Sequence, residues 1–232
     1  MSEEKKLVPQ MGIGLDGYAK SEIFPEDSNP KEKIAELFKL MYDRNLTDAS
    51  GGNMSCRVDD KIYISPRYAG EVYRLQIKPD QVLTLNLDSE VLEGDPNTLT
   101  REGSIHTNVY KRFSSVKAII HAHTKNVILL SSLGINIPPN TTMFKHLIGP
   151  DPVDICDEVG PATDSLSETV IECFARREDR LNKYGAAVMI PNHGVIVAAR
   201  NLDYAFCLLE TVDTSAYIHT QKMILESIGA QK

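Results

Sequence analysis

Two histidines stand two positions apart in the apolar segment IIHAHTKN, residues 119–126. If this segment is a strand, His121 and His123 project from the same face and reach one point above the sheet. Neutral imidazole nitrogens arranged in this way suit zinc. The alternative is that each is a hydrogen-bonded core histidine, and the pair alone does not decide between the two interpretations.

A third histidine, His193, lies in a Pro-Asn-His-Gly turn between the apolar runs AAVMI and VIVAA. A turn between two strands would hold the imidazole on a rigid scaffold, open to a cleft, as a third metal ligand requires. The alternative is a turn histidine that serves local hydrogen bonding. Three histidines without a cysteine partner favour an open catalytic zinc site over a closed structural one.

Two further segments carry groups that can bind or transform a substrate. Glu102 precedes His106 by four residues, so the two share a face if both are helical, and the carboxylate could act as a metal ligand or general base. On local sequence alone, a first-turn glutamate that favours the helix dipole is the better interpretation. The stretch SGGNMSCR, residues 50–57, resembles an anion-binding loop in which Gly51 and Gly52 admit a close ligand and Ser50 and Asn53 donate, although Gly-Gly turns are common.

Apolar periodicity and turn residues predict the elements that would carry these side chains. They are, in order, a helix over 31–46, a hairpin over 47–66, a strand pair over 81–95, a helix over 100–113, a strand over 117–123, helices over 124–134 and 165–185, strands over 186–190 and 195–199, and a helix over 201–229. The Pro-rich segment 137–163 has no predicted element. Strand pairs with few crossover helices favour an α/β protein with three layers, α/β/α, around a largely antiparallel sheet.

Composition limits the classes of partner and location. The net charge of −7 argues against a nucleic-acid or membrane partner, and four scattered cysteines indicate reduced thiols. There is no apolar segment of signal-peptide type at the N-terminus, and the longest apolar stretch, 186–199, is too short to span a bilayer, so we expect a cytoplasmic protein. The first thirty residues mix charges, Gly and Pro, which predicts an irregular N-terminal arm and a single domain over 31–232.

Five short motifs in order resemble the class II aldolase/adducin family, from about residue 31 to the C-terminus. They are GGN-x-S-x-R (51–57), I-S-P (64–66), E-x-x-x-H (102–106), H-A-H (121–123) and N-H-G (192–194). That family includes fuculose-phosphate and rhamnulose-phosphate aldolases, ribulose-phosphate 4-epimerase and methylthioribulose-phosphate dehydratase. The motifs are specific as an ordered set, whereas no single one is decisive.

The resemblance implies a zinc-dependent aldolase with a class II aldolase-like fold. His121, His123 and His193 would bind one Zn²⁺ per chain, with another divalent metal as the alternative, and Glu102 would be the acid/base that moves a proton at the reacting carbon. Zinc would stabilise an enediolate of a small hydroxy-carbonyl substrate, and the family's homotetramers place active sites at subunit interfaces. A metal-dependent decarboxylase of a hydroxy or keto acid is the alternative enzyme. An adducin-like interaction module is the non-enzymatic alternative, which the intact histidine set disfavours.

Two departures from the family pattern concern the substrate. Sugar-phosphate aldolases have Ser/Thr-Gly after I-T/S-P and two serines before the glutamate, and all of these bind phosphate. This chain has Arg67-Tyr68 after Ser65-Pro66, and Thr100-Arg101 before Glu102, so the resemblance makes Ser65, Arg67, Thr100 and Arg101 the candidate substrate-binding residues. Arginine binds both phosphate and carboxylate, so these residues do not decide which of the two the substrate carries. The alternative is that both arginines point to solvent and do not contact the substrate. No tyrosine in 143–149 matches the one that some family members lend across the interface; the candidates to replace it are Lys145, His146 and Tyr217.

Overall fold

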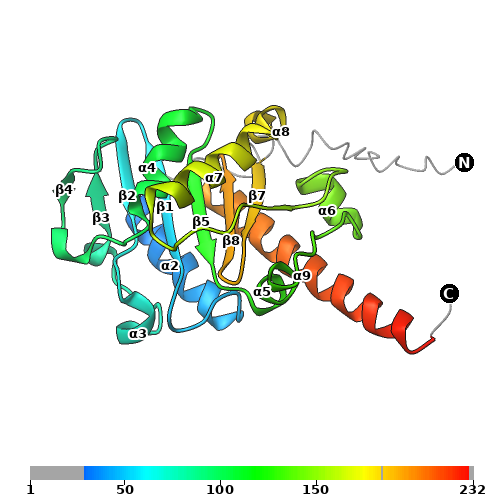
Figure 1. The fold of residues 1–232 in the computed structure, drawn as a ribbon. Coiled ribbons are helices and arrows are strands. Elements are labelled where there is room, and N and C mark those ends of the chain that lie inside the picture. The colour runs from blue at the N-terminus through cyan, green and yellow to red at the C-terminus, as the bar shows by residue number, and fades with distance from the viewer. Residues whose placement is uncertain (1–28, 184, 230–232) are drawn as a thin grey trace, which may run out of the picture.

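The computed structural model describes residues 29–183 and 185–229, which are arranged around one eight-stranded sheet (Figure 1). The strands are β1 (Asn53–Val58), β2 (Lys61–Ile64), β3 (Leu83–Leu85), β4 (Val91–Glu93), β5 (Ala118–Ala122), β6 (Asp154–Ile155), β7 (Gly185–Ile190) and β8 (Gly194–Ala199). Their order across the sheet is β4-β3-β2-β1-β5-β8-β7-β6, and β6 with β7 is the parallel pair. The predicted N-terminal arm lies outside the described residues, apart from residues 29 and 30.

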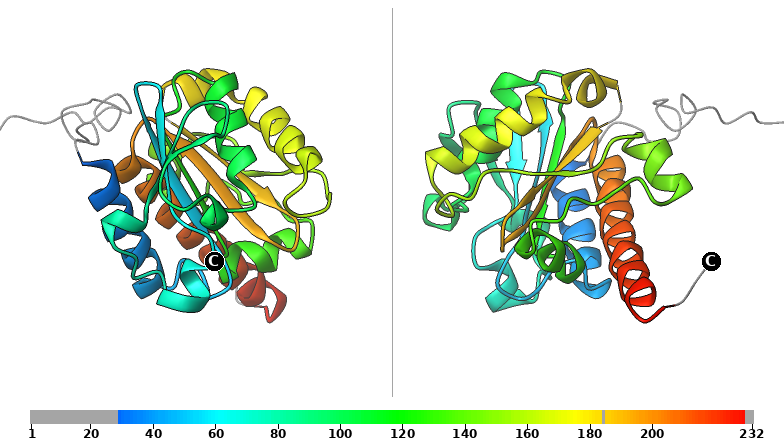
Figure 2. Two further views of the ribbon diagram at one scale, coloured as in Figure 1. Left: turned by 90° about the vertical axis from the view of Figure 1, so that its left-hand side faces the viewer. Right: turned by 45° about the vertical axis from the view of Figure 1, so that its right-hand side comes forward.

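Helices cover both faces of the sheet (Figure 2). They are α2 (Pro30–Asp43), α3 (Ala69–Tyr73), α4 (Gly103–Arg112), α5 (Lys125–Ser132), α6 (Thr142–Leu147), α7 (Asp164–Ala175), α8 (Glu178–Lys183) and α9 (Leu202–Ser227). In the right-hand view of Figure 2 the sheet lies between α7 on one side and α2 and α9 on the other. The predicted three-layer α/β/α architecture with a largely antiparallel sheet is therefore confirmed.

The alternation of side chains along β5 divides the core into two apolar clusters. Ile120 packs with the cluster that includes α2 and α9, whereas Ile119 packs with the cluster that includes α4 and α7. Because successive strand residues face opposite sides, His121 projects toward the same side as Ile119. The central strands are buried on both faces, which explains why β5 and β8 are apolar throughout except at His121.

The structure corrects two predicted helices and fills the unassigned segment. The single helix predicted over 165–185 is wrong: α7 ends at Ala175 and α8 begins at Glu178. The run RREDR at 176–180 offers no apolar side chain to bury, and Leu181 is the next residue in the core. The helix predicted from residue 100 begins at Gly103. The unassigned segment 137–163 contains α6 and β6.

No helix among the described residues combines the length and the apolar character that crossing a membrane requires.

Candidate metal centre and active site

His121, His123 and His193 converge at one end of the central strands. One nitrogen from each lies within 4.8 Å of the other two. His121 belongs to β5, His123 follows its last residue, and His193 lies in the turn between β7 and β8. Since β8 pairs with β5, with Ile196 opposite His121, the β7–β8 turn is carried to the end of β5.

Two glycines permit this approach. A Cβ at Gly194 would lie 2.3 Å from the Ala122 carbonyl oxygen, and a Cβ at Gly51 would lie 1.8 Å from the His123 ring. Both distances are far below van der Waals contact, so neither position accepts a side chain without displacing its neighbour. Gly51 therefore creates the space that the His123 imidazole occupies.

The donor set of the three rings fits a metal ion. The Nδ1–H of His121 donates to the Val195 carbonyl oxygen at 3.1 Å, which leaves its Nε2 as a lone pair. That Nε2 lies 3.0 Å from Nε2 of His123, whose Nδ1 faces Asp48 Oδ1 at 3.4 Å. If both Nδ1 atoms carry the proton, two lone pairs point at each other across 3.0 Å, an arrangement that a cation between them stabilises.

The protonation state of the rings supports the same conclusion. Burial lowers the pKa of His121, His123 and His193 below the usual value, that of His123 to about 4. Neutral imidazole is the form that binds a metal. The three side chains thus present neutral nitrogens at near-neutral pH.

Glu102 lies beside this cluster. Its Oε2 is 3.4 Å from Nε2 of His121, and its Oε1 is 3.7 Å from Nε2 of His193. The residue precedes the first turn of α4, but its side chain does not cap the helix, so helix capping does not explain its position. Instead, Nδ2 of Asn53 donates to Oε2 at 2.8 Å.

The carboxyl group of Glu102 is ionised in this environment. Burial alone would raise its pKa, but the neighbouring His121 and the hydrogen bond from Asn53 outweigh burial, and the net pKa lies below the usual value. The carboxylate is the form that accepts a proton. Glu102 and His106 were predicted to share a helix face. Instead, the Asn53 amide connects them, because its nitrogen donates to Glu102 and its oxygen contacts Nε2 of His106.

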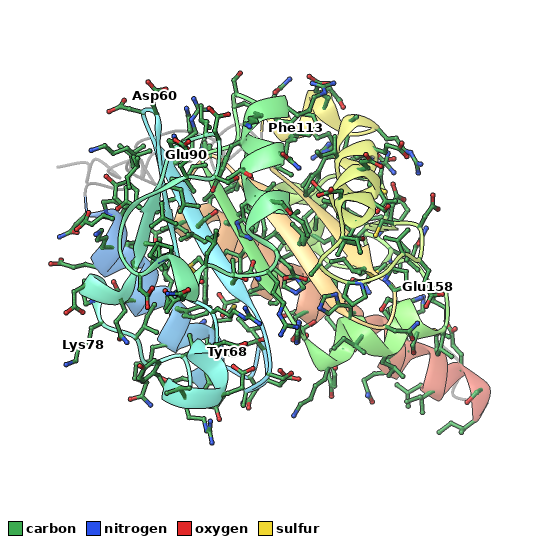
Figure 3. All side chains as sticks on the ribbon, turned by 60° about the vertical axis from the view of Figure 1, so that its left-hand side comes forward. Asp60, Tyr68, Lys78, Glu90, Phe113 and Glu158 are labelled. Carbon is green, nitrogen blue, oxygen red and sulfur yellow. The ribbon has the colours of Figure 1, made fainter. Side chains whose placement is uncertain are left out.

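A cavity of about 280 Å³ opens over the histidines and Glu102. One wall is the segment 66–71 around the start of α3, where Figure 3 labels Tyr68, and Pro161 and Ala162 contribute to the lining from the segment before α7, where Figure 3 labels Glu158. The predicted site residues that line it are Ser50, Gly51, Gly52, Asn53, Arg67, Thr100, Arg101, Glu102, His123 and His193. Distant sequence segments therefore meet at one opening.

Ser65 does not join this lining. It is fully buried, and its Oγ accepts the backbone N–H of Met54 at 3.0 Å while its own N–H donates to the Met54 carbonyl. Ser65 thus stabilises the β1–β2 pairing, and the geometry gives no support to its predicted contact with substrate. Lys145, His146 and Tyr217 also lie outside the lining of this cavity.

Sequence reasoning missed several residues of the site, including Asp48, Pro161, Ala162 and the wall residues 69–71. Asp48 accepts hydrogen bonds from the backbone N–H and the hydroxyl of Ser50 and faces His123, so it orients a predicted ligand. The Asp-x-Ser spacing, typical of a side chain that bonds the backbone two residues on, was the available signal. Pro161 and Ala162 come from the segment without a predicted element, and nothing local marks them as cavity residues.

Comparison with known proteins agrees with the geometry. Residues 32–220 match the model of the Class II Aldolase and Adducin N-terminal domain. The chain is 30% identical over 204 residues to 5-deoxy-D-ribulose 1-phosphate aldolase of Bacillus thuringiensis serovar kurstaki, which covers 87% of this chain and 88% of the relative. It is 27% identical to L-fuculose phosphate aldolase of Methanocaldococcus jannaschii, over 84% of this chain and 98% of the relative.

Another relative and a solved structure extend the comparison. A 3-oxo-tetronate 4-phosphate decarboxylase of Haemophilus influenzae is 23% identical over 89% of this chain and 91% of its own. A solved L-fuculose 1-phosphate aldolase superposes with a TM-score of 0.74 at 24% identity, covering 87% of this chain and 88% of the other, which supports the fold. The match over most of the chain and the ordered site residues lead to one conclusion: the chain belongs to the class II aldolase/adducin family.

Proposed function

We propose that this protein is a metal-dependent lyase, an aldolase that cleaves or forms a carbon–carbon bond in a small hydroxy-carbonyl substrate with an anionic group. The observation that carries the proposal is the convergence of three neutral histidines with the Glu102 carboxylate, 3.4 and 3.7 Å from two of them, under an open cavity. Perturbed titratable groups at the floor of a cavity are typical of an active site. The named relatives, an aldolase, a second aldolase and a decarboxylase, are lyases.

Each group in the site has a defined part in this proposal. His121, His123 and His193 would hold one Zn²⁺, which when bound supplies a Lewis acid for the substrate's oxygen atoms. Glu102 transfers the proton to or from the reacting carbon, because it is ionised and borders the cavity. Asp48 and the Val195 carbonyl orient two of the histidines.

The anionic group of the substrate would bind to the arginines of the cavity. Arg67 and Arg101 line this cavity, and the Arg67 guanidinium carbon lies 4.3 Å from the centre of the Tyr68 ring. A stacked guanidinium keeps its donors free for phosphate or carboxylate. Because the two named aldolase relatives act on sugar phosphates, a phosphorylated ketose is our first candidate.

The two arginines also favour a second candidate, a decarboxylase of a hydroxy or keto acid. Arginine binds carboxylate with two parallel hydrogen bonds as readily as phosphate. One relative is a decarboxylase of a 3-oxo acid phosphate. A panel of ketose 1-phosphates and 3-oxo acid phosphates, assayed for released aldehyde and released CO₂, separates the two reactions.

The first experiment tests the metal and the acid/base together. We expect elemental analysis to find about one divalent metal per chain in both wild type and Glu102→Gln. Turnover of the panel substrate should fall at least about a hundredfold in Glu102→Gln, because the amide cannot accept a proton. Glu90→Gln, an exposed change of the same kind, should leave turnover unchanged.

Three outcomes would contradict the proposal. Near-normal turnover in Glu102→Gln would remove that residue from the chemistry. Metal-free protein that also fails to take up added Zn²⁺ would favour the adducin-like interaction module. Metal-loaded wild type that turns over none of the panel would reject both candidate reactions.

A further inference from the structure

A line of five buried polar side chains runs from the cavity into the protein. Asn53 bonds Glu102 at 2.8 Å and also contacts Nε2 of His106 through its Oδ1. Nδ1 of His106 lies 2.6 Å from the hydroxyl of Ser55, which lies 2.7 Å from the hydroxyl of Tyr110. The order is Glu102, Asn53, His106, Ser55, Tyr110.

Two regular elements generate this line because their repeats match. Glu102, His106 and Tyr110 recur every four residues at the start of and along α4, whereas Asn53 and Ser55 are two apart on β1. Four helical residues rise about 6 Å. Two strand residues rise about 6.6–6.8 Å, a similar distance, so side chains from α4 and from β1 interdigitate along the line.

The carboxylate at the Glu102 end of the line determines which group donates in each hydrogen bond. The Glu102 carboxylate only accepts, so the Asn53 amide nitrogen faces it and Oδ1 faces His106. Nε2 of His106 must then donate, and burial, which lowers the pKa of His106 to about 3, keeps the ring neutral with a bare Nδ1. Ser55 therefore donates to Nδ1, and Tyr110 donates to Ser55.

The far end of the line is remote from the substrate. Ser55 and Tyr110 are fully buried and His106 is 1% exposed, and none of the three lines the cavity. The hydrogen-bonded line is therefore the direct connection between the Tyr110 hydroxyl and the cavity. Directed hydrogen bonds in a low-dielectric interior strengthen one another, so loss of the last donor weakens the first.

We propose that His106, Ser55 and Tyr110 are positioning residues, which lock the Asn53 amide and so fix the carboxylate of Glu102 in its productive orientation. This rests on the proposed role of Glu102. It also gives Asn53 a task other than anion binding, since both polar atoms of its amide are engaged inside the protein. The line predicts one tautomer of His106, with hydrogen on Nε2.

The tautomer is tested without any substrate. In ¹⁵N-histidine-labelled protein, the His106 signals, assigned by their loss in His106→Gln, should show a protonated Nε2 and a bare Nδ1. Ser55→Ala should shift the Nδ1 resonance more than the Nε2 resonance, because it removes the donor to Nδ1. A protonated Nδ1 in the wild type would overturn the proposed direction of the line.

The positioning role is tested by Tyr110→Phe against Tyr204→Phe. Both tyrosines are fully buried, but the Tyr204 hydroxyl bonds the Leu147 carbonyl in the other apolar cluster. We expect Tyr110→Phe to lower kcat about two- to tenfold with KM and metal content unchanged. Tyr204→Phe should lower the melting temperature by about as much as Tyr110→Phe does, but should leave kcat unchanged.

A conservative variant separates positioning from packing. His106→Gln keeps an N–H donor for Asn53 and should retain more kcat than His106→Leu, which keeps none. Equal kcat in Tyr110→Phe, Tyr204→Phe and wild type, while Glu102→Gln is inactive, would overturn the positioning role alone. An active Glu102→Gln would instead overturn the proposed function, and the ¹⁵N measurement would still decide whether the line exists.

Discussion

At the scale of single residues, Gly51 shows how the site depends on space as much as on ligands. Its φ lies outside the left-handed region, so alanine is not excluded by backbone conformation. The obstacle is the His123 ring, 1.8 Å from the Cβ that alanine would add. The local Gly-Gly pattern predicted that this glycine helps to bind an anion, whereas the geometry gives it a part in placing His123, a predicted metal ligand.

Substitution of Gly51 distinguishes these two tasks. We expect Gly51→Ala to displace His123 and weaken Zn²⁺ affinity about 10- to 100-fold, as loss of ligand orientation usually does. Titration with a zinc-chelating dye measures that affinity. Gly160→Ala is the matched control, because its added Cβ would meet Thr163 at an ordinary 3.4 Å. Unchanged zinc affinity with a raised KM for the anionic substrate would restore the anion-binding interpretation.

At the scale of elements, segments with a clear apolar pattern, such as α2 and β5, were predictable, whereas α3, α6 and β6 were not. The apolar run within 117–123 located β5, and the apolar stripe of Ile34, Phe38 and Met41 located α2. β6 has two residues and is held by pairing with β7 and by the nearby Ile137–Val153 bridge, contacts that no local pattern encodes.

The start of α4 is the boundary that mattered most for the site. Periodicity extended the helix back to residue 100, but the observed start at Gly103 leaves Glu102 before the first turn. That shift turns the Glu102 side chain toward the histidines instead of along the helix. The types of the site residues were readable from sequence, whereas their hydrogen-bond partners, such as Asn53 with Glu102, depended on packing α4 against β1.

The packing of α4 against β1 also predicts how stability depends on pH. His106 is neutral in the folded protein down to about pH 3, whereas an unfolded histidine titrates near 6.5. Between pH 3 and 6.5 the unfolded chain binds more protons at this histidine than the folded protein does. The free energy of unfolding therefore increases as the pH rises through this range and decreases as the pH falls. The contribution of one such group approaches about 1.4 kcal/mol per pH unit.

Metal-free protein and its His106→Gln variant isolate this contribution. We expect urea unfolding to show a steeper fall in stability between pH 6.5 and 4 for wild type than for His106→Gln. Because the other buried histidines remain in both proteins, the difference in slope belongs to residue 106. Parallel curves would mean that His106 titrates alike in the folded and unfolded states.

At the scale of the whole molecule, the C-terminal part of α9 and the residue after it carry apolar side chains that the rest of the described chain leaves exposed. Tyr217, Ile224, Leu225 and Ile228 are 51%, 48%, 51% and 72% exposed. Tyr217, Ile224 and Ile228 recur at spacings of seven and four, which places them on one helical face. Exposed apolar groups of this kind mark contact surfaces between proteins, and Figure 1 shows this end of α9 extending beyond the sheet.

The expected homotetramer would bury this face, and its active sites would then depend on assembly. We expect light scattering to give a tetramer for wild type and a smaller species for Ile224→Glu/Leu225→Glu, because charge on an apolar interface costs desolvation energy. Lys222→Glu, which adds negative charge away from that face, should stay tetrameric. If the active site needs a neighbouring chain, kcat falls with the loss of tetramer while each chain keeps its metal. A dissociated variant with full kcat would show that the site is complete within one chain, and a monomeric wild type would reject the tetramer itself.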